Sequence, residues 1–330
     1  MKKNIAIVAG GDQSEVVVSL KSAEGLKTFI DSSEYNLFIV ILEKNNWRIR
    51  LENGEEYPLD RNDFSTEING KKLTFDCVYN TIHGIPGEDG RLQGYLDMIR
   101  LPYTSSGVLA SSVTFNKFFC NTYLKAFGIK SAESMMLRKG MSVRPEEVIE
   151  RVGLPCFIKP NAGGSSFGVT KAVQSSDIAP AIEKAFQESD EIIIEAFIKG
   201  TEVTNGIYKT LEREVIMPVT EVVPKNEYFD FEAKYTPGMA EEITPARISD
   251  ELTRKIQKLT SAIYSILGCK GIVRVDYIIS DKTIYLLEVN TTPGMTLTSF
   301  IPQQIRAMEV PIADVFTEII EDSIARNQAI

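Results

Sequence analysis

Hydrophobic runs alternate with amphipathic segments through the first hundred residues of the chain. Residues 5–9 form a continuous apolar run that ends at Gly10-Gly11, and residues 37–42 form a second run. Continuous apolar runs of this length are typical of strands buried on both faces of a parallel sheet. Because a helical stretch from about 14 to 30 separates the two runs, we predict an open parallel α/β sheet at the N-terminus.

Two further signals complete this first region. Asn53-Gly54 lies within residues 47–59 and is a strong signal for a β-hairpin. Residues 77–82 are another predicted strand, which leads into the loop 83–90. Loops at the strand ends of an open α/β sheet commonly bind ligands.

The pattern changes after Pro102, where small residues mark a boundary. Mixed helices and strands then replace the regular alternation, so we expect an N-terminal α/β domain over 1–102, an α+β lobe over 103–198 and a second α+β lobe over 199–330. The predicted later elements are a helix over 108–127, a strand over 156–159, a strand ending at 173, helices over 176–188 and 250–267, a strand pair over 272–280 and 284–290, and a helix over 312–326.

The strand pair is the most informative part of the sequence. Side chains alternate between the two faces of a strand, and the odd-numbered positions here form an apolar set that needs a core. A three-residue connection, 281–283, would set Ser280 opposite Ile284. The even-numbered positions place four polar side chains on the other face: Arg274, Asp276, Glu288 and Asn290.

This register would set Asp276 opposite Glu288 and Arg274 opposite Asn290. Like charges directly opposite each other destabilise a sheet, so the two carboxylates need a cation between them. A few carboxylate and amide oxygens suit Mg²⁺, which keeps water and phosphate as its other ligands. The alternative interpretation is a solvated hairpin face on which the arginine screens the acids.

A glycine-rich loop, 163–168, lies between two predicted strands directly after Lys159-Pro160. Glycines let backbone N–H groups approach a polyphosphate closely. The loop is not a Walker A motif, because no Lys-Ser/Thr pair follows it and a strand comes next. On its own it is equally consistent with a flexible turn. Lys117 lies between aromatic residues in a predicted helix, and Glu195 interrupts an apolar strand.

Composition narrows the choice of partners. The chain has 330 residues and a net charge of −9, which disfavours a nucleic acid as the main partner. Its four cysteines are widely spaced and show no C-x-x-C, so neither a disulfide framework nor a zinc site is indicated. The N-terminal apolar run meets Asp12 too early for a signal peptide. We expect a soluble cytoplasmic protein with no membrane span.

The motifs occur in an order that resembles the D-alanine–D-alanine ligases, a family of ATP-grasp ligases. The likeness runs from about residue 4 to 325, and the ordered set is far more specific than any single motif. The matching segments are 9–15 with 18–20, His83-Gly84 with 87–90, 101–104 with Ser106-Gly107, Lys117, Lys159-Pro160, 164–166, 231–235, 268–271, Arg274 with Asp276, and 287–296.

The resemblance implies an ATP-grasp fold in which two α+β lobes clasp ATP beside the N-terminal α/β sheet. It implies ligation of two D-alanines through a D-alanyl phosphate, with release of ADP and phosphate, for peptidoglycan precursor synthesis. It also implies two Mg²⁺ ions, with Mn²⁺ as an alternative, and a homodimer that binds neither nucleic acid nor membrane. The segment 224–245 would be a lid over the reaction.

The resemblance further implies a role for each matching residue. Those that would bind ATP are Lys117, Lys159, Ser166, Glu195, Phe197, Ile198, Glu202 and Lys234. The metal ligands would be Asp276, Glu288 and Asn290. The D-alanines would contact Glu15, His83, Arg274, Gly294 and Ser299. In catalysis, Glu15, Ser165 and Tyr235 would form a hydrogen-bonded triad, Lys234 would reach the transferred phosphate, and Arg274 with the Gly294 N–H would form an oxyanion hole.

Some positions depart from the family or admit another interpretation. Ala196-Phe197 stand where a Lys-Trp pair is frequent, which should alter adenine stacking. His83, the single histidine, could equally be a hydrogen-bonding residue that shapes its loop. Rival functions are another ATP-grasp carboxylate–amine ligase, a nicotinamide-dependent oxidoreductase, for which no G-x-G-x-x-G is present, and a ligand sensor of periplasmic-binding type.

Overall fold

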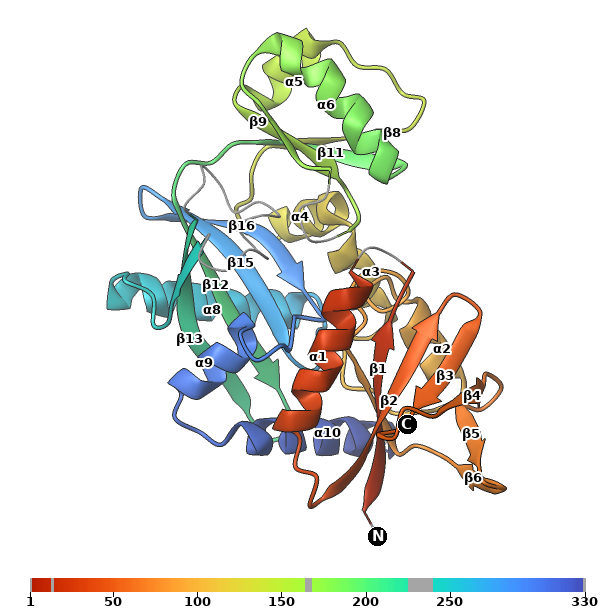
Figure 1. The fold of residues 1–330 in the computed structure, drawn as a ribbon. Helices are drawn as coiled ribbons and strands as arrows, with labels where there is room; N and C mark the ends of the chain where they lie inside the picture. Colours follow the sequence, from red (N-terminus) through yellow and green to blue (C-terminus); the bar gives the residue numbers. More distant parts are fainter. Residues whose placement is uncertain (1, 13–14, 164–167, 225–239, 329–330) are drawn as a thin grey trace.

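The computed structural model describes residues 2–12, 15–163, 168–224 and 240–328, which build three sheets (Figure 1). The N-terminal sheet has a parallel centre and an antiparallel extension. β1 (Lys3–Gly10) pairs in parallel with β2 (Tyr35–Glu43) and with β7 (Cys77–Asn80). Residues 5–10 are all buried, because side chains cover both faces of β1. The predicted parallel sheet is therefore confirmed for these three strands.

The antiparallel extension begins at the edge of β2. It contains β3 (Asn46–Arg50), β4 (Glu56–Asp60), β5 (Ser65–Ile68) and β6 (Lys71–Leu73). The hairpin predicted from Asn53-Gly54 is the β3–β4 pair, and Gly54 has the positive φ of 85° that favours glycine. The helices of this region are α1 (Val16–Phe29) and α2 (Arg91–Met98).

The single helix predicted over 108–127 is wrong. The chain forms α3 (Val108–Phe115) and α4 (Lys117–Lys125), separated by the extended residue Asn116. The Asn116 side chain accepts a hydrogen bond from the Phe119 N–H at 3.0 Å and so caps α4. Asparagine competes with helical backbone hydrogen bonds and favours this capping position. The break places Lys117 at the first turn of a new helix.

The central lobe is a four-stranded sheet covered by two helices (Figure 1). Its strands run in the order β10 (Thr170–Ala172), β9 (Cys156–Pro160), β11 (Glu191–Ala196) and β8 (Ser134–Arg138). The apolar sides of α5 (Pro145–Val152) and α6 (Ser175–Glu188) pack on one face of this sheet and bury its core.

The third sheet carries five antiparallel strands in the order β14-β13-β12-β15-β16. Its helices are α8 (Asp250–Ile266) and α9 (Phe300–Ala307). The last helix, α10 (Ile312–Gln328), returns to the N-terminal region, where the Phe316 ring stacks on Phe29 of α1 at 5.7 Å between centroids. The strands are β12 (Thr201–Lys209), β13 (Glu214–Pro224), β14 (Ala240–Ile243), β15 (Val273–Ser280) and β16 (Thr283–Asn290).

Candidate functional site

The β15–β16 hairpin has the predicted register at its polar end. Asp276 pairs with Glu288 and Arg274 pairs with Asn290. The turn end differs from prediction, because Ser280 pairs with Thr283 rather than with Ile284. Asp281 and Lys282 form a two-residue turn with φ values of 46° and 66°, which is the left-handed geometry that tight hairpins favour.

A β-bulge reconciles the shorter turn with the predicted pairs. It lies after Asp276, where Tyr277 pairs with Leu286 and one residue of β16 is left over. As a result Leu286 is buried in place of Leu287, which the strict alternation assigned to the core. The sequence pattern does not reveal this inversion because both residues are leucine.

Asp276 is the centre of a buried hydrogen-bond network on this face. Its Oδ1 accepts from Arg274 Nε at 2.9 Å and from Thr204 Oγ1 at 2.5 Å. Its Oδ2 accepts from Arg274 Nη2 at 2.8 Å and from Asn290 Nδ2 at 3.1 Å. These four bonds use the whole acceptor capacity of one carboxylate. Arg274 is thereby held in a bidentate pair, with its guanidinium carbon 5.3 Å from the Phe300 ring centroid.

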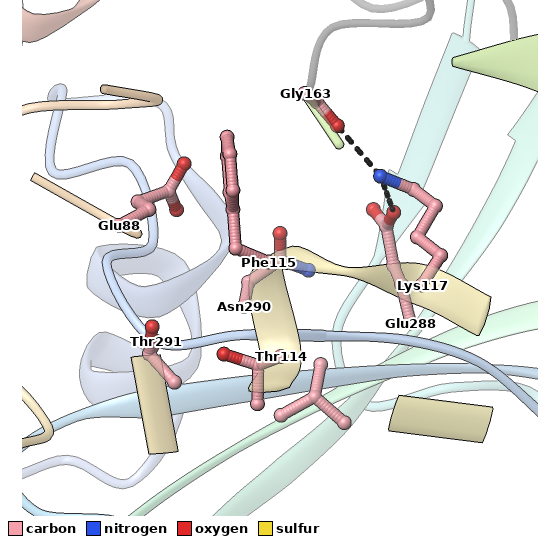
Figure 2. A pocket seen from close by; sticks show the side chains of 9 residues that line it. Glu88, Thr114, Phe115, Lys117, Gly163, Glu288, Asn290 and Thr291 are labelled. Carbon is pink, nitrogen blue, oxygen red and sulfur yellow. Dashed lines mark hydrogen bonds and ion pairs between the residues drawn. The ribbon is translucent and has the colours of Figure 1, made fainter. Parts of the chain in front are cut away.

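Lys117 joins this face from the central lobe. Its Nζ donates to the Gly163 carbonyl at 2.6 Å and lies 3.8 Å from Glu288 Oε2 (Figure 2). Asn161, which is fully buried, holds the start of α4 in place by accepting from the Phe118 N–H through Oδ1 at 2.9 Å. The pocket is lined by Glu88, Thr114, Phe115, Lys117, Gly163, Glu288, Val289, Asn290 and Thr291.

Lys159 lies on β9 and forms an ion pair with Glu195 on β11 at 2.5 Å. Burial disfavours the ammonium, but the carboxylates of Glu195, Glu288 and Glu202 outweigh it, so the pKa of Lys159 is raised. Asn121 also donates to Glu195 at 3.2 Å. The structure therefore brings two predicted ATP-binding residues into direct contact, and a role of Glu195 toward adenine or ribose stays a prediction.

The residues after β11 lie beside an aromatic pair. Phe197 packs edge-on against Phe157 at 5.9 Å, and its backbone N–H donates to the Pro155 carbonyl at 3.0 Å. The Lys171 Nζ lies 4.0 Å from the Phe197 ring centroid, which is a close cation–π contact. Ile198 follows in the chain and is partly exposed. The sequence alone does not single out Lys171, because its contact with Phe197 depends on strand pairing across the lobe.

Glu88 is a second residue of the site that the sequence motifs do not single out, since it appears there only within the matching segment 87–90. Its carboxylate accepts from the Gly84 N–H at 2.7 Å, and its own N–H donates to the Gly84 carbonyl at 2.8 Å. Burial and the nearby Glu15 carboxylate raise the pKa of Glu88 to about 8, although the Gly84 bond and Lys117 act in the opposite direction. The signal available in the sequence was an acidic residue between two glycines, in a loop that follows a predicted strand.

Glu15 and His83 lie near each other at the N-terminal edge of the site. Glu15 is buried directly before α1, and its charge acts on both His83 and Glu88. Burial lowers the pKa of His83, and Arg274 acts in the same direction, while Glu15 opposes them. His83 Nε2 is buried and has no hydrogen-bond partner within the described ranges. A buried ring nitrogen of this kind is a natural contact for a small ligand.

The loop with Gly294 and Ser299 precedes α9. Ser299 Oγ accepts from the Thr296 N–H at 3.0 Å and lies 2.8 Å from Thr296 Oγ1. A Cβ at position 294 would approach Ser299 Oγ to 3.0 Å, so glycine allows the backbone to pass close to this hydroxyl. The structure therefore brings Gly294, predicted for the oxyanion hole, close to Ser299, predicted to bind the acceptor.

Four predicted site residues lie outside the described residues: Ser165, Ser166, Lys234 and Tyr235. Most of the expected lid, 224–245, falls there too. Within the described parts of the chain, no cluster of three or more His, Cys, Asp or Glu side chains is arranged to hold a metal. In the same residues, no helix has the length and apolar character that crossing a membrane would require.

Side chains from all three regions meet at this site. The N-terminal region supplies Glu88, the central lobe supplies Lys117, and the five-stranded sheet supplies Glu288 and Asn290. Two α+β lobes that hold lysines against carboxylates in this way define an ATP-grasp ligase.

Comparison with known proteins places the chain within that class. Residues 4–106 match the family described as D-ala D-ala ligase N-terminus, and residues 123–321 match D-ala D-ala ligase C-terminus. A D-alanine--D-alanine ligase of Bacteroides fragilis is 62% identical over 323 residues, which are 98% of this chain and 99% of that protein. The chain belongs to the D-alanine–D-alanine ligase family.

Solved structures of similar proteins cover the whole chain. The D-alanine--D-alanine ligase from Bacillus anthracis complexed with ATP is 26% identical, with a TM-score of 0.78 and coverage of 99% of both chains. The VanG D-Ala:D-Ser ligase from Enterococcus faecalis is 27% identical, with a TM-score of 0.84 over 97% of this chain and 99% of that chain. Proteins named for different acceptors thus share this fold.

Proposed function

We propose that the chain joins two D-alanine molecules to D-alanyl-D-alanine, with ATP as co-substrate and with ADP and phosphate as the other products. One observation carries the proposal. The polar end of the β15–β16 hairpin holds Arg274, Asp276, Glu288 and Asn290 on one face, opposite Lys117 from the other lobe. Together with the family membership, this face is suited to a nucleotide's terminal phosphates.

The chemistry of the donor set fits Mg²⁺, because Asp276, Glu288 and Asn290 offer hard oxygen atoms and few of them. We propose that these three residues hold two ions, with Mn²⁺ as an alternative. Bound ions would neutralise phosphate charge during transfer. Since the protein donors already use the acceptor capacity of Asp276, the Asn290 amide must give up its bond or present its oxygen instead.

In the first step, the carboxylate oxygen of one D-alanine attacks the γ-phosphorus of ATP, and the bond to the β-phosphate oxygen breaks to release ADP. We propose that Lys117 and Lys159 bind phosphate oxygens; the Lys117 ammonium lies 3.8 Å from Glu288 Oε2 of the other lobe, and the charge of Glu288 also acts on Lys159. We propose that Glu15 binds the ammonium of this first D-alanine, and that His83 Nε2 contacts the same molecule. Positioning and charge neutralisation account for most of the catalysis of phosphoryl transfer.

In the second step, the amine of the other D-alanine attacks the acyl carbon, and the C–O bond to phosphate breaks. The tetrahedral intermediate carries an oxyanion, which Arg274 and the Gly294 N–H would stabilise, and one such donor is commonly worth about 3 kcal/mol. The bidentate Asp276 pair fixes the Arg274 guanidinium for this role. Ser299 would bind the carboxylate of the acceptor.

The remaining expectations are proposals of the same kind. We infer that Ser165, Tyr235 and Glu15 form the triad that closes the site, that Ser166 and Lys234 bind phosphate, and that residues 224–245 exclude water from the acyl phosphate. Phe197, Ile198 and Glu202 would surround adenine and ribose. We further propose a cytoplasmic homodimer that serves peptidoglycan synthesis.

The deciding experiment is product identification by mass spectrometry after incubation with ATP, Mg²⁺ and D-alanine. We expect D-alanyl-D-alanine together with stoichiometric ADP. D-serine, the acceptor named for the VanG ligase, and D-lactate, a hydroxy acid, are each added as a competing acceptor to test rival ligase specificities. If no phosphate is released from ATP when D-alanine is the only amino acid present, the proposal is refuted.

A further inference from the structure

α9 carries two adjacent glutamines, Gln303 and Gln304, whose side chains bind different segments of the chain. Gln304 is fully buried, and its side chain bonds to the Gly206 N–H at 2.9 Å, the Thr204 carbonyl at 3.1 Å and Thr220 Oγ1 at 3.0 Å. These bonds, together with buried apolar residues of the helix, dock α9 on β12 and β13. The helix therefore has an anchor that does not depend on Gln303.

Gln303 reaches outward from the same helix and joins two other segments. Its Nε2 donates to Glu242 Oε2 on β14 and to the Thr298 carbonyl at 2.7 Å. Leu297 and Thr298 are exposed, so burial does not hold this part of the loop. Hydrogen bonds to the two carbonyls hold it instead, since Arg306 Nη1 donates to the Leu297 carbonyl at 3.0 Å.

Glu242 belongs to the electrostatic environment of the reacting centre. Burial raises the pKa of Glu242, whereas the Gln303 bond and the charge of Arg274 act in the opposite direction. Its hydrogen-bond partner is a neutral amide, so the carboxylate fixes the amide's orientation without forming an ion pair with it. An amide oriented in this way presents a hydrogen to the Thr298 carbonyl, one residue before Ser299.

We propose that Glu242 and Gln303 are positioning residues that hold the 294–299 loop for the second D-alanine and thereby set the affinity for this acceptor. The proposal rests on the proposed ligase function. Both residues act through the loop, where Ser299 would bind the carboxylate of the acceptor and the Gly294 N–H would contribute to the oxyanion hole. Loss of the pair should raise the KM for the acceptor and leave the KM for ATP unchanged, because the described residues proposed to bind ATP lie on the central lobe and, for Glu202, at the start of β12.

The test compares Glu242→Met, Gln303→Met, the double variant and the conservative Glu242→Gln in the full-length chain. Rates are measured against D-alanine concentration and fitted to separate constants for the first and second site, with the KM for ATP and kcat determined alongside. Gln257→Met is the matched control, because Gln257 is a partly buried glutamine on α8 whose Nε2 donates to the Met217 carbonyl at 3.2 Å.

We expect each methionine variant to raise the acceptor KM about tenfold, the factor that corresponds to loss of roughly one hydrogen bond. The double variant should show the same tenfold change, because the two residues act as a unit. Glu242→Gln retains an acceptor for the amide and should stay within about twofold of the wild type. The KM for ATP should not change, and kcat should fall by less than the acceptor KM rises, because Glu242 lies within 224–245, the segment proposed to exclude water.

Three results would overturn the proposal. The first is an increase in acceptor KM in the double variant that equals the product of the two single increases, and the second is an increase in Glu242→Gln as large as in Glu242→Met. The third is a loss of kcat and of thermal stability that accompanies every change in acceptor KM. Wild-type turnover with unaltered acceptor constants in every variant would overturn this inference alone. A wild-type chain that makes no dipeptide would overturn the ligase function as well. The Gln257→Met control separates a general cost of losing a glutamine from the effect of this pair.

Discussion

Glu88→Gln should remove a pH-dependent destabilisation of the folded chain. The carboxyl group lies beside the Glu15 carboxylate, and its pKa rises from the ordinary 4.5 to about 8, mainly through burial. Between those two values the folded state keeps a proton that the unfolded state loses. The stability that this group contributes is therefore complete below pH 4.5 and is lost as pH rises through about 8.

The size of the effect follows from linkage. One proton of difference changes the unfolding free energy by about 1.4 kcal/mol per pH unit, so roughly 3 kcal/mol is lost across two pH units inside the window. The Glu88 side chain is partly exposed to the pocket, where water screens the Glu15 charge, and we expect about 1–3 kcal/mol. Glutamine keeps the volume and the acceptor for the Gly84 N–H, but it does not titrate.

Urea unfolding of both proteins at pH 5.5, 6.5 and 7.5, without nucleotide or divalent ion, measures this difference. The stability of the variant relative to the wild type should grow steadily with pH. Other titrating groups contribute equally to both proteins and cancel in the comparison. A difference that stays constant with pH would refute the reasoning, because it would mean that Glu88 has the same pKa in both states.

Four further substitutions test the site and the fold. Glu288→Gln should keep the fold by circular dichroism but lower ATP turnover with D-alanine by roughly 10²-fold at saturating Mg²⁺, and wild-type rates would contradict the metal assignment. Gly271→Ala should cost several kcal/mol, because a Cβ there would lie 1.7 Å from the Thr104 carbonyl oxygen. Gly268→Ala, at the same φ of 63° with nothing within 4 Å of its Cβ, should cost only about 1–2 kcal/mol; equal thermal shifts would reject the steric explanation. Asn116→Ala should lower stability by at least about 1 kcal/mol, because it removes the α4 cap together with the side-chain bonds to Asn161 and Glu191, and an unchanged urea midpoint would show that these bonds contribute nothing.

Local patterns in the sequence were sufficient to assign a strand or its buried face where only one arrangement buries the apolar side chains. The apolar run 5–9 had to be a central strand, and the alternation along 273–290 had to place Asp276 and Glu288 on one face. The register at the polar end agrees with the prediction although the alternation along β16 is interrupted, because the two-residue turn and the bulge after Asp276 shift the pairing by one residue in opposite directions. The motif order then supplied the family.

Tertiary structure decided what depends on contacts between distant segments. The bulge that buries Leu286 and leaves Leu287 partly exposed depends on both the turn geometry and the packing of the core. The break between α3 and α4 at Asn116 depends on its contact with residues 161–162. The raised pKa of Glu88 requires Glu15 to lie nearby, although 72 residues separate the two in the chain. Sequence patterns indicate which side chains of a segment are buried and which are exposed to water. Strand pairing, desolvation of charged groups and coupling between charges depend on contacts between segments that only folding brings together.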